Sequence, residues 1–412
     1  MTIIEGLINI LGSLESDKIA VHEERCVSVR HKRANCLRCA EACTSGAISY
    51  TDNNLTIDPS LCIGCGSCAT ACPTCAIELR SPTDAQMVAF AKKAITSSSG
   101  HPVFACETAL QRAIDLQQSS SGKGRIHNSI PFDGAQIVGM PCLGRIDEAL
   151  LCAMAAYGCR STHLVCDDCE HCIHRPGGLQ AREVVKSAQN LLDAFGSTMP
   201  ISLDSMFPPH VRTTNTETYG GTNRREFFES IKTTSSRVAG DALQKSAIDA
   251  GVASAPTHPA YRKVNADGTL SRFTPERRTR LFNYLRHIGD PTQPQVTSRI
   301  IGSVHIESTA CSSCRMCATF CPTGALLRAE NHSDGFFGIV HRPTLCMQCR
   351  LCESICPTGA LSISSTVPSD LFIGKKAECV RMTPPDWTPN KPDSMFQKIH
   401  NSLGDSLPMT MF

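Results

Sequence analysis

The chain has 412 residues, of which 25 are cysteines, and its formal net charge at pH 7 is only +2. The length, the repeated C-x2-C spacings and the missing secretory leader exclude a small secreted disulfide scaffold, so we expect a reducing, cytoplasmic compartment. The low charge provides no basic field for nucleic acid, and no apolar run reaches the roughly 18 residues that span a membrane.

The first residues show an amphipathic pattern. Apolar side chains recur at helical spacing at Ile3, Ile4, Leu7, Ile8, Leu11 and Leu14. This stripe predicts an N-terminal helix, which either docks on a partner or packs on the domain that follows it. We assign the helix and that domain to residues 1–85.

Eight cysteines between residues 26 and 72 form two runs of four. The second run has the spacing C-x2-C-x2-C-x3-C-P, whereas nine residues, VSVRHKRAN, stretch the first gap of the first run. In such runs three sulfurs face one 4Fe-4S cluster, and the fourth turns to the other cluster. We therefore expect two crossed ligand sets: Cys26, Cys36, Cys39 and Cys72 for one cluster, and Cys62, Cys65, Cys68 and Cys43 for the other.

Several residues of this block depart from the regular pattern. Thr44 follows Cys43 where a proline is usual, and Cys75 stands where the later repeats have glycine. We interpret Cys75 as a small buried residue in preference to a ligand. The inserted loop and its leading edge are basic, which favours a solvated loop that screens an anionic cluster over a docking edge for an acidic partner. The basic residues are Arg25, Arg30, His31, Lys32 and Arg33.

Residues 86–200 alternate strand-like and helix-like segments, as in an α/β domain with a parallel sheet. We expect strands at 101–106, 135–142 and 161–166, and helices at 145–158 and 179–196. Each strand ends in a cysteine, and the carboxyl ends of parallel strands share one edge, where ligands collect. We therefore expect five cysteines to converge there: Cys106, Cys142, Cys166, Cys169 and Cys172. Ordinary buried thiols explain Cys152 and Cys159.

This segment resembles the delta subunit of methyl-viologen-reducing hydrogenase, an iron-sulfur protein that passes electrons from a hydrogenase to heterodisulfide reductase. The resemblance rests on the cysteine after the first strand, on MPCLGRIDEALLCAMAAYG and on VCDDCEHCIHRPGG. It implies one central cluster, 2Fe-2S in preference to 4Fe-4S, whose ligands are Cys106, Cys142, Cys172 and either Cys166 or Cys169. The alternatives are a zinc site and unligated buried thiols.

Residues 201–300 contain no cysteine and are rich in Thr, Ser, Asn and Pro, which predicts an extended linker. One short helix is expected within it, capped by Thr274 and ended by Gly289. Its apolar face comprises Leu281, Phe282, Leu285 and Ile288. The NRREFF segment at 223–228 has the letters of a twin-arginine export signal, but its mid-chain position favours an exposed helix start.

Residues 301–366 have the most regular cysteine pattern. Two C-x2-C-x2-C-x3-C runs each end in CPTGAL. The crossing rule assigns Cys311, Cys314, Cys317 and Cys356 to one 4Fe-4S cluster, and Cys346, Cys349, Cys352 and Cys321 to the other. This block resembles the bacterial two-cluster ferredoxins, which implies their pseudo-twofold α+β fold, and the first block is similar. A pair of zinc knuckles is the alternative. Residues 367–412 are expected to form a C-terminal tail, in which Cys379 stands alone.

The predicted fold class is thus multi-domain, α+β at both ends and α/β in the centre. Iron-sulfur clusters pass single electrons, and no nucleotide loop or Ser/His/Asp set stands in a recognisable context. We therefore predict an electron-transfer subunit of a cytoplasmic oxidoreductase complex in anaerobic metabolism, not catalytic alone, in which the central domain joins the two outer blocks. Its partners would be a catalytic subunit of the flavin, molybdopterin or hydrogenase type and a second electron carrier. The alternatives are an enzyme with a substrate site at an incompletely ligated central cluster and an iron-sulfur sensor.

Overall fold

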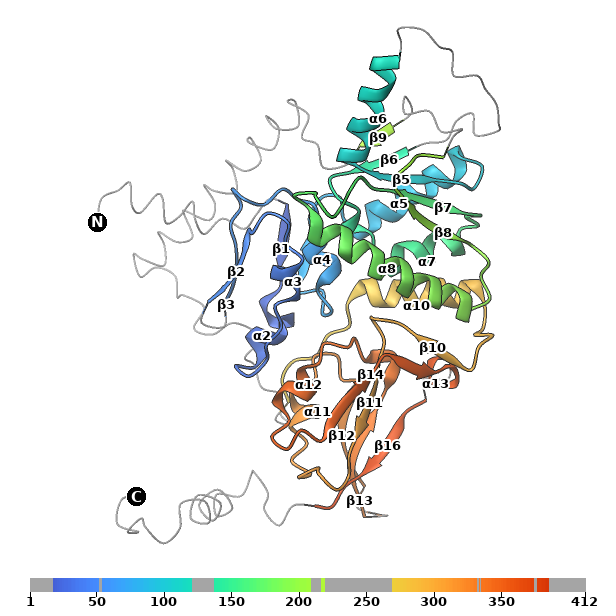
Figure 1. The fold of residues 1–412 in the computed structure, drawn as a ribbon. Coiled ribbons are helices and arrows are strands. Elements are labelled where there is room, and N and C mark those ends of the chain that lie inside the picture. The colour runs from blue at the N-terminus through green and yellow to red at the C-terminus, as the bar shows by residue number, and fades with distance from the viewer. Residues whose placement is uncertain are drawn as a thin grey trace, which may run out of the picture.

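The computed structural model shows three blocks of structure (Figure 1). The predicted N-terminal helix and the NRREFF segment lie outside the residues that it describes. These are residues 18–51, 54–120, 137–208, 216–218, 269–331, 333, 335–373 and 376–384. No helix in these ranges is both long enough and apolar enough to cross a bilayer.

The N-terminal block, blue in Figure 1, has two small antiparallel sheets and short helices. One sheet pairs β1 (Ile19–Val21) with β4 (Ile77–Leu79), and the other pairs β2 (Ile48–Thr51) with β3 (Asn54–Ile57). The helices are η1 (Glu23–Arg25), α2 (Val27–Arg30), α3 (Arg38–Glu41) and α4 (Ser67–Ala71). Cys39 lies in α3 and Cys68 in α4, and the other cysteines of the two runs lie in the segments between the helices and strands.

A five-stranded parallel sheet, in the order β8-β7-β5-β6-β9, forms the central block. Its strands are β5 (Val103–Cys106), β6 (Ile137–Met140), β7 (Thr162–Val165), β8 (Ile201–Asp204) and β9 (Thr216–Thr218). The three predicted strands are confirmed as β5, β6 and β7. The two edge strands, β8 and β9, both lie within residues 201–300, the range assigned to an extended linker, so that assignment is wrong for these segments.

Four helices and one short turn complete this block: α5 (Asp84–Ser97), α6 (Glu107–Ser120), η2 (Leu143–Arg145), α7 (Glu148–Ala156) and α8 (Arg175–Ala194). The α5 helix begins with a capping box between Thr83 and Gln86. The α8 helix begins four residues before the predicted start at 179, because Arg175 to Gly178 form its first turn.

The predicted helix after the linker is confirmed as α10 (Glu276–Ile288), although Pro275 rather than Thr274 is its N-cap residue. It packs against α7, and Leu281 and Leu285 are each only 1% exposed. Phe282 and Ile288 pack on the same core while half-buried. This part of the segment assigned to a linker therefore belongs to the hydrophobic core of the central block.

Three small antiparallel sheets build the C-terminal block, drawn in orange and red in Figure 1. They pair β10 (Gln295–Thr297) with β15 (Thr366–Pro368), β11 (Ser303–Ile306) with β14 (Leu361–Ser364), and β13 (Phe336–His341) with both β12 (Leu326–Asn331) and β16 (Glu378–Arg381). Its helices are α11 (Met316–Phe320), η4 (Pro343–Leu345), α12 (Leu351–Ile355) and α13 (Ser369–Ile373). Part of the segment assigned to a tail is therefore folded, and Cys379 lies in β16.

The N-terminal block contacts both other blocks, which also pack on each other through α8 and β10 (Figure 1). On one side, α4 contacts η2 and α8. On the other side, Val27 of α2 packs with Leu351 and Ile355 of α12. All four residues of α2 are buried. The expectation of a solvated loop is therefore wrong for α2, which lies at an interface between blocks, whereas Lys32 and Arg33 after it are exposed.

Candidate iron-sulfur centres

Five cysteines from four chain segments line one pocket at the carboxyl edge of the central sheet. Cys106 ends β5, Cys142 follows β6, and Cys166 follows β7, while Cys169 and Cys172 lie in the loop before α8. The pocket contains about 380 Å³ of empty space. The convergence expected from parallel strand ends is therefore present in the fold.

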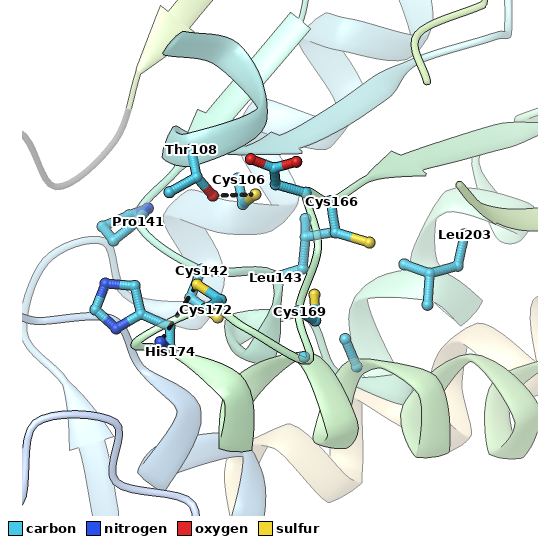
Figure 2. A pocket seen from close by; sticks show the side chains of 13 residues that line it. Cys106, Thr108, Pro141, Cys142, Leu143, Cys166, Cys169, Cys172, His174 and Leu203 are labelled. Carbon is cyan, nitrogen blue, oxygen red and sulfur yellow. Dashed lines mark hydrogen bonds between the residues drawn. The ribbon is translucent and has the colours of Figure 1, made fainter. Parts of the chain in front are cut away.

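The five sulfurs do not all face the pocket in the same way (Figure 2). Figure 2 shows the Cys166 sulfur turned toward Leu203 of β8, whereas the Cys169 sulfur points into the space shared with Cys106 and Cys142. The Cys166 thiol donates a hydrogen bond to the Asp204 carbonyl, with 3.7 Å between sulfur and oxygen. The two thiols still interact with each other, so Cys166 and Cys169 differ in the direction of their sulfurs and not in their proximity to the pocket.

The first turn of α8 approaches the sulfurs so closely that only glycine fits there. A Cβ on Gly177 would lie 2.5 Å from the Cys142 Sγ, and a Cβ on Gly178 would lie 2.6 Å from the Cys169 Sγ. A Cβ on Gly144 would lie 2.8 Å from the Gly177 Cα. Contacts under about 3 Å force displacement, so these glycines form a cradle around the cysteines.

Hydrogen-bond donors surround the sulfurs of the pocket. The backbone N–H of His174 donates to the Cys172 Sγ over 3.3 Å, and that of Gly144 donates to the Cys142 Sγ over 3.5 Å. The Thr108 hydroxyl lies 3.1 Å from the Cys106 Sγ. Such donors stabilise negative charge on sulfur and tune the potential of a thiolate-bound cluster. Soft sulfur donors, N–H donors and a glycine cradle therefore fit an iron-sulfur group.

Burial and mutual repulsion raise the pKa of two thiols that face the pocket. Burial raises the pKa of Cys142 and of Cys169 to about 12, and the neighbouring thiolates add to the shift. A thiol must lose its proton to bind iron, so loading of the pocket releases protons. In the part of the chain that the structure describes, no group of three or more His, Cys, Asp or Glu side chains is arranged to hold a metal ion.

The N-terminal block brings its eight cysteines together as two neighbouring groups. Burial raises the pKa of Cys26 to about 11, and the charges of Cys72 and Cys36 contribute. Burial likewise raises the pKa of Cys39, and so do the charges of Cys72, Cys26 and Cys36. The second group surrounds Cys68, whose pKa is raised by burial and then by Cys65, Cys39, Cys62 and Cys43. Sulfurs from distant parts of the block thus meet in the crossed manner of the expected sets.

One group of the C-terminal block is equally clear. Burial raises the pKa of Cys352, and Cys349, Cys346 and Cys321 raise it further. In the other group, burial raises the pKa of Cys317, and the charges of Cys314 and Cys311 raise it further. Cys356 differs, because hydrogen bonds from Thr358 and nearby backbone N–H groups outweigh its burial and lower its pKa. The structure therefore gathers seven of these eight cysteines by mutual interaction, while the strongest interactions of Cys356 are local.

The central pocket adjoins the N-terminal block at Ser67. After burial and the Gly144 N–H, the strongest influence on the pKa of Cys142 is Cys65. The Ser67 Oγ lies 3.7 Å from the Cys65 Sγ, and a Cβ on Gly177 would lie 2.8 Å from the same oxygen. Ser67 was not identified from the sequence, because its role depends on a contact with another block.

The N-terminal and C-terminal blocks also meet at cysteines. Burial raises the pKa of Cys349, and Cys36 of the N-terminal block is among the charges that add to it. Both cysteines pack against the apolar contact made by Val27, Leu351 and Ile355. Arg38 donates to the Gln348 carbonyl over 3.2 Å across the same boundary. The cysteine groups of the N-terminal block therefore adjoin those of both other blocks, and the central block packs directly on the C-terminal block as well.

The remaining cysteines are mostly buried. Cys75 adopts a φ of 48°, in the left-handed region occupied by Gly324 and Gly359 in the later repeats. Burial raises the pKa of Cys75 to about 12. Cys152 and Cys159 are also buried, whereas Cys379 is exposed. Thr44, which replaces the usual proline, places its hydroxyl 3.4 Å from the Cys65 Sγ.

Comparison with known families supports this division of the chain. Residues 310–360 match the 4Fe-4S dicluster domain, and residues 55–78 match the 4Fe-4S binding domain. Residues 102–201 match the delta subunit of methyl-viologen-reducing hydrogenase. The chain thus has ferredoxin-like ends around a delta-like domain. Both resemblances found in the sequence are confirmed.

Two curated proteins are similar to short parts of the chain. One, from Escherichia coli (strain K12), has the name oxidoreductase AegA; it is 49% identical over 35 residues, or 8% of this chain and 5% of that protein. The other is the isethionate sulfite-lyase activating enzyme of Nitratidesulfovibrio vulgaris (Hildenborough), 40% identical over 65 residues. That match covers 15% of this chain and 20% of the relative. The chain therefore spans only a small fraction of either relative.

Proposed function

We propose that the chain is a multi-cluster electron-transfer subunit of an oxidoreductase complex. The observation that supports this most directly is that cysteines of neighbouring blocks lie close enough to affect each other. Cys65 raises the pKa of Cys142, and Cys36 raises the pKa of Cys349. When bound, iron-sulfur clusters accept and release single electrons. The chain itself holds the clusters by thiolates, buries them and directs N–H donors at the sulfurs.

The proposed ligands of the four 4Fe-4S clusters are the sixteen cysteines of the two ferredoxin-like blocks in their crossed sets. For the delta-like domain we propose Cys106, Cys142, Cys169 and Cys172. Cys166 is the fifth cysteine of the pocket and faces β8. Four sulfurs suffice for a 2Fe-2S cluster, which is the type that we propose here, as well as for a 4Fe-4S cluster.

The resulting order of centres differs from the order of the cysteines along the chain. The central pocket is at one end, next to the group that contains Cys65. The group that contains Cys36 follows, then the group that contains Cys349, and the group that contains Cys311 is at the other end. The fold would thus form one linear path, with entry and exit at the delta-like domain and at the C-terminal block.

The partners that we propose are a catalytic redox subunit, of the flavin, molybdopterin or hydrogenase type, and a second electron carrier. The match of the central segment to a hydrogenase delta subunit supports a complex of this kind. We place the complex in a reducing compartment, the cytoplasm, where the proposed thiolate ligands would stay reduced. Anaerobic purification of the native complex, followed by identification of its members, would name the partners.

A second candidate is an enzyme whose central cluster has an open coordination position. Such a cluster would use three thiolates of the pocket, with one cysteine acting on substrate. Four sulfurs besides Cys166 line the pocket, which favours complete ligation and hence the relay. A stoichiometric substrate complex at the central cluster, detected as a perturbed cluster spectrum, would favour the enzyme instead.

The relay can be tested by injecting an electron at a known end. Cys379 is the exposed cysteine of the C-terminal block, so a photosensitiser coupled to it provides an electron source there. After a flash, rapid-freeze EPR should detect reduction of the central cluster. Removal of an intermediate cluster with Cys36→Ala should stop this transfer while the two ends keep their clusters. Cys152→Ala, at a buried cysteine outside the proposed sets, is the control. Undiminished transfer in Cys36→Ala would contradict the linear path.

A further inference from the structure

Arg30 is a buried cation at the boundary between the two ferredoxin-like blocks. It is the last residue of α2, the helix formed by the loop that stretches the first cysteine run, and its side chain is 6% exposed. Among the described residues, no carboxylate forms an ion pair with it. A buried charge without a counter-charge destabilises the folded protein, so we expect a negative group to lie close to the Arg30 guanidinium.

Two of its nitrogens donate to backbone carbonyls, one in its own block and one in a segment that flanks a cysteine of the neighbouring block. The Nη1 donates to the Glu24 carbonyl and the Nη2 donates to the Ser271 carbonyl, both over 2.9 Å. The segment at 269–273 in turn donates from Leu270 N to the Thr319 carbonyl over 3.2 Å and from Phe273 N to the Pro322 carbonyl over 2.9 Å. These two bonds flank Cys321.

The third nitrogen has a free donor. The Nε of Arg30 is buried and has no hydrogen-bond partner among the described residues. Burial lowers the pKa of the guanidinium, and the charges that oppose this most strongly are those of Cys321 and Cys349. Both belong to the cysteine group of Cys346 and Cys352. A spare N–H beside thiolates is the arrangement that a cluster sulfur would satisfy.

We propose that Arg30 tunes the cluster held by Cys321, Cys346, Cys349 and Cys352, donating its Nε–H to a sulfur there and stabilising the reduced form by its charge. The inference rests on the proposed function, which places a cluster at this site. An electron that leaves the reduced cluster of the Cys36 group adds one negative charge beside Arg30. No proton has to move, because the guanidinium is already cationic. Arg30 therefore favours passage from the N-terminal to the C-terminal block.

The charge is tested by a pair of substitutions in the same loop. In Arg30→Gln, redox titration followed by EPR should show the midpoint potential of this cluster lowered; the cluster is identified by the signal that Cys349→Ala removes. At a fixed potential near the midpoint, the ratio of reduced to oxidised cluster should fall about tenfold, which equals 59 mV for one electron. Arg33→Gln, at an exposed position three residues away, should leave the ratio unchanged. An unchanged midpoint in a fully loaded Arg30→Gln protein overturns the proposal.

A second measurement does not depend on that variant binding iron. In wild-type protein labelled with ¹⁵N-arginine, pulsed EPR of the reduced cluster should detect a nitrogen coupling. Arg30→Lys, which keeps the charge but lacks the Nε–H, should lose the coupling and show a smaller potential shift than Arg30→Gln. Absence of the coupling in the wild type would refute the hydrogen bond. If wild-type protein shows the coupling but passes no electrons between its blocks, the relay is wrong and the role of Arg30 stands.

Discussion

A Cβ on Gly177 would lie 2.5 Å from the sulfur of Cys142. This distance links the Pro-Gly-Gly sequence at the start of α8 directly to the central pocket. Glycine is unfavourable inside a helix by roughly 0.5–1 kcal/mol relative to alanine, so its presence at two consecutive positions calls for a local reason. The close approach of Gly177 and Gly178 to the sulfurs of Cys142 and Cys169 is that reason.

We therefore predict that Gly177→Ala and Gly178→Ala each impair the central cluster. The added methyl group must displace a sulfur or the first turn of α8, and overpacking of this kind costs roughly 1–3 kcal/mol. After anaerobic reconstitution, the central EPR signal should be lost or reduced while the four 4Fe-4S clusters stay at full occupancy. Arg175→Ala, at an exposed position in the same turn, should load normally. Normal loading of both glycine variants would contradict the cradle.

The five cysteines of the pocket should differ in their effects. Single Ala substitutions at Cys106, Cys142, Cys169 and Cys172 should each abolish the central signal and lower the iron content by about two atoms if the cluster is 2Fe-2S. Cys166→Ala should keep the signal, since the Cys166 thiol is directed to the Asp204 carbonyl. Iron analysis and EPR of the five variants measure this. The reverse result for Cys166 and Cys169 would overturn our choice between them.

The crossed ligand sets predict an effect in the opposite half of the C-terminal block. Cys356→Ala should damage the cluster of Cys311, Cys314 and Cys317 rather than the cluster supported by its own run. The wild-type chain should hold about 18–20 iron atoms, and this variant should lose about four if the damaged cluster is released. Cys379→Ala, at an exposed cysteine outside the sets, is the control. Spectroscopic loss confined to the cluster of Cys346, Cys349 and Cys352 would refute the crossing.

The ferredoxin-like runs and the parallel sheet were predictable because both depend on local spacing. Four cysteines in a short run specify their own turns, and the alternation of apolar strands with amphipathic helices specifies βαβ units. The meeting of Cys106, Cys142 and Cys166 followed from a general rule about strand ends. These inferences did not require any knowledge of contacts between residues far apart in the sequence.

The spatial order of the three blocks could not be predicted in this way. It depends on contacts between residues far apart in sequence, such as Val27 with Leu351 and Ser67 with Gly144. The choice between Cys166 and Cys169 likewise depends on β8, whose Asp204 carbonyl accepts from the Cys166 thiol. A local signal did exist for the buried α2 helix, because the inserted loop contains two valines among its basic residues.

Asp84 connects the central block to α10 through buried ion pairs. Its carboxylate binds Arg145 over 2.6 Å and Arg277 over 2.8 Å. Burial alone would raise the pKa of Asp84, but these two guanidinium groups outweigh it and hold the pKa well below its usual range. The pair of arginines also reaches Asp147, at 3.7 Å from Arg145 and 3.2 Å from Arg277.

We predict that Asp84→Asn destabilises the folded protein by roughly 3–5 kcal/mol at neutral pH, because it leaves two buried cations with half of their counter-charge. In the wild type, the stabilising contribution of Asp84 is fully present above the unfolded-state pKa of about 3.9 and is lost as pH falls below it toward the depressed folded-state pKa. Below pH 4 the free energy of unfolding should therefore decrease less steeply in Asp84→Asn than in the wild type. Denaturant unfolding at several pH values, on protein of matched iron content, measures both effects.

Glu276→Gln, which removes an exposed partner of Arg280, should change stability by less than about 1 kcal/mol. Equal stability of Asp84→Asn and Glu276→Gln would show that the buried network does not hold α10 in place.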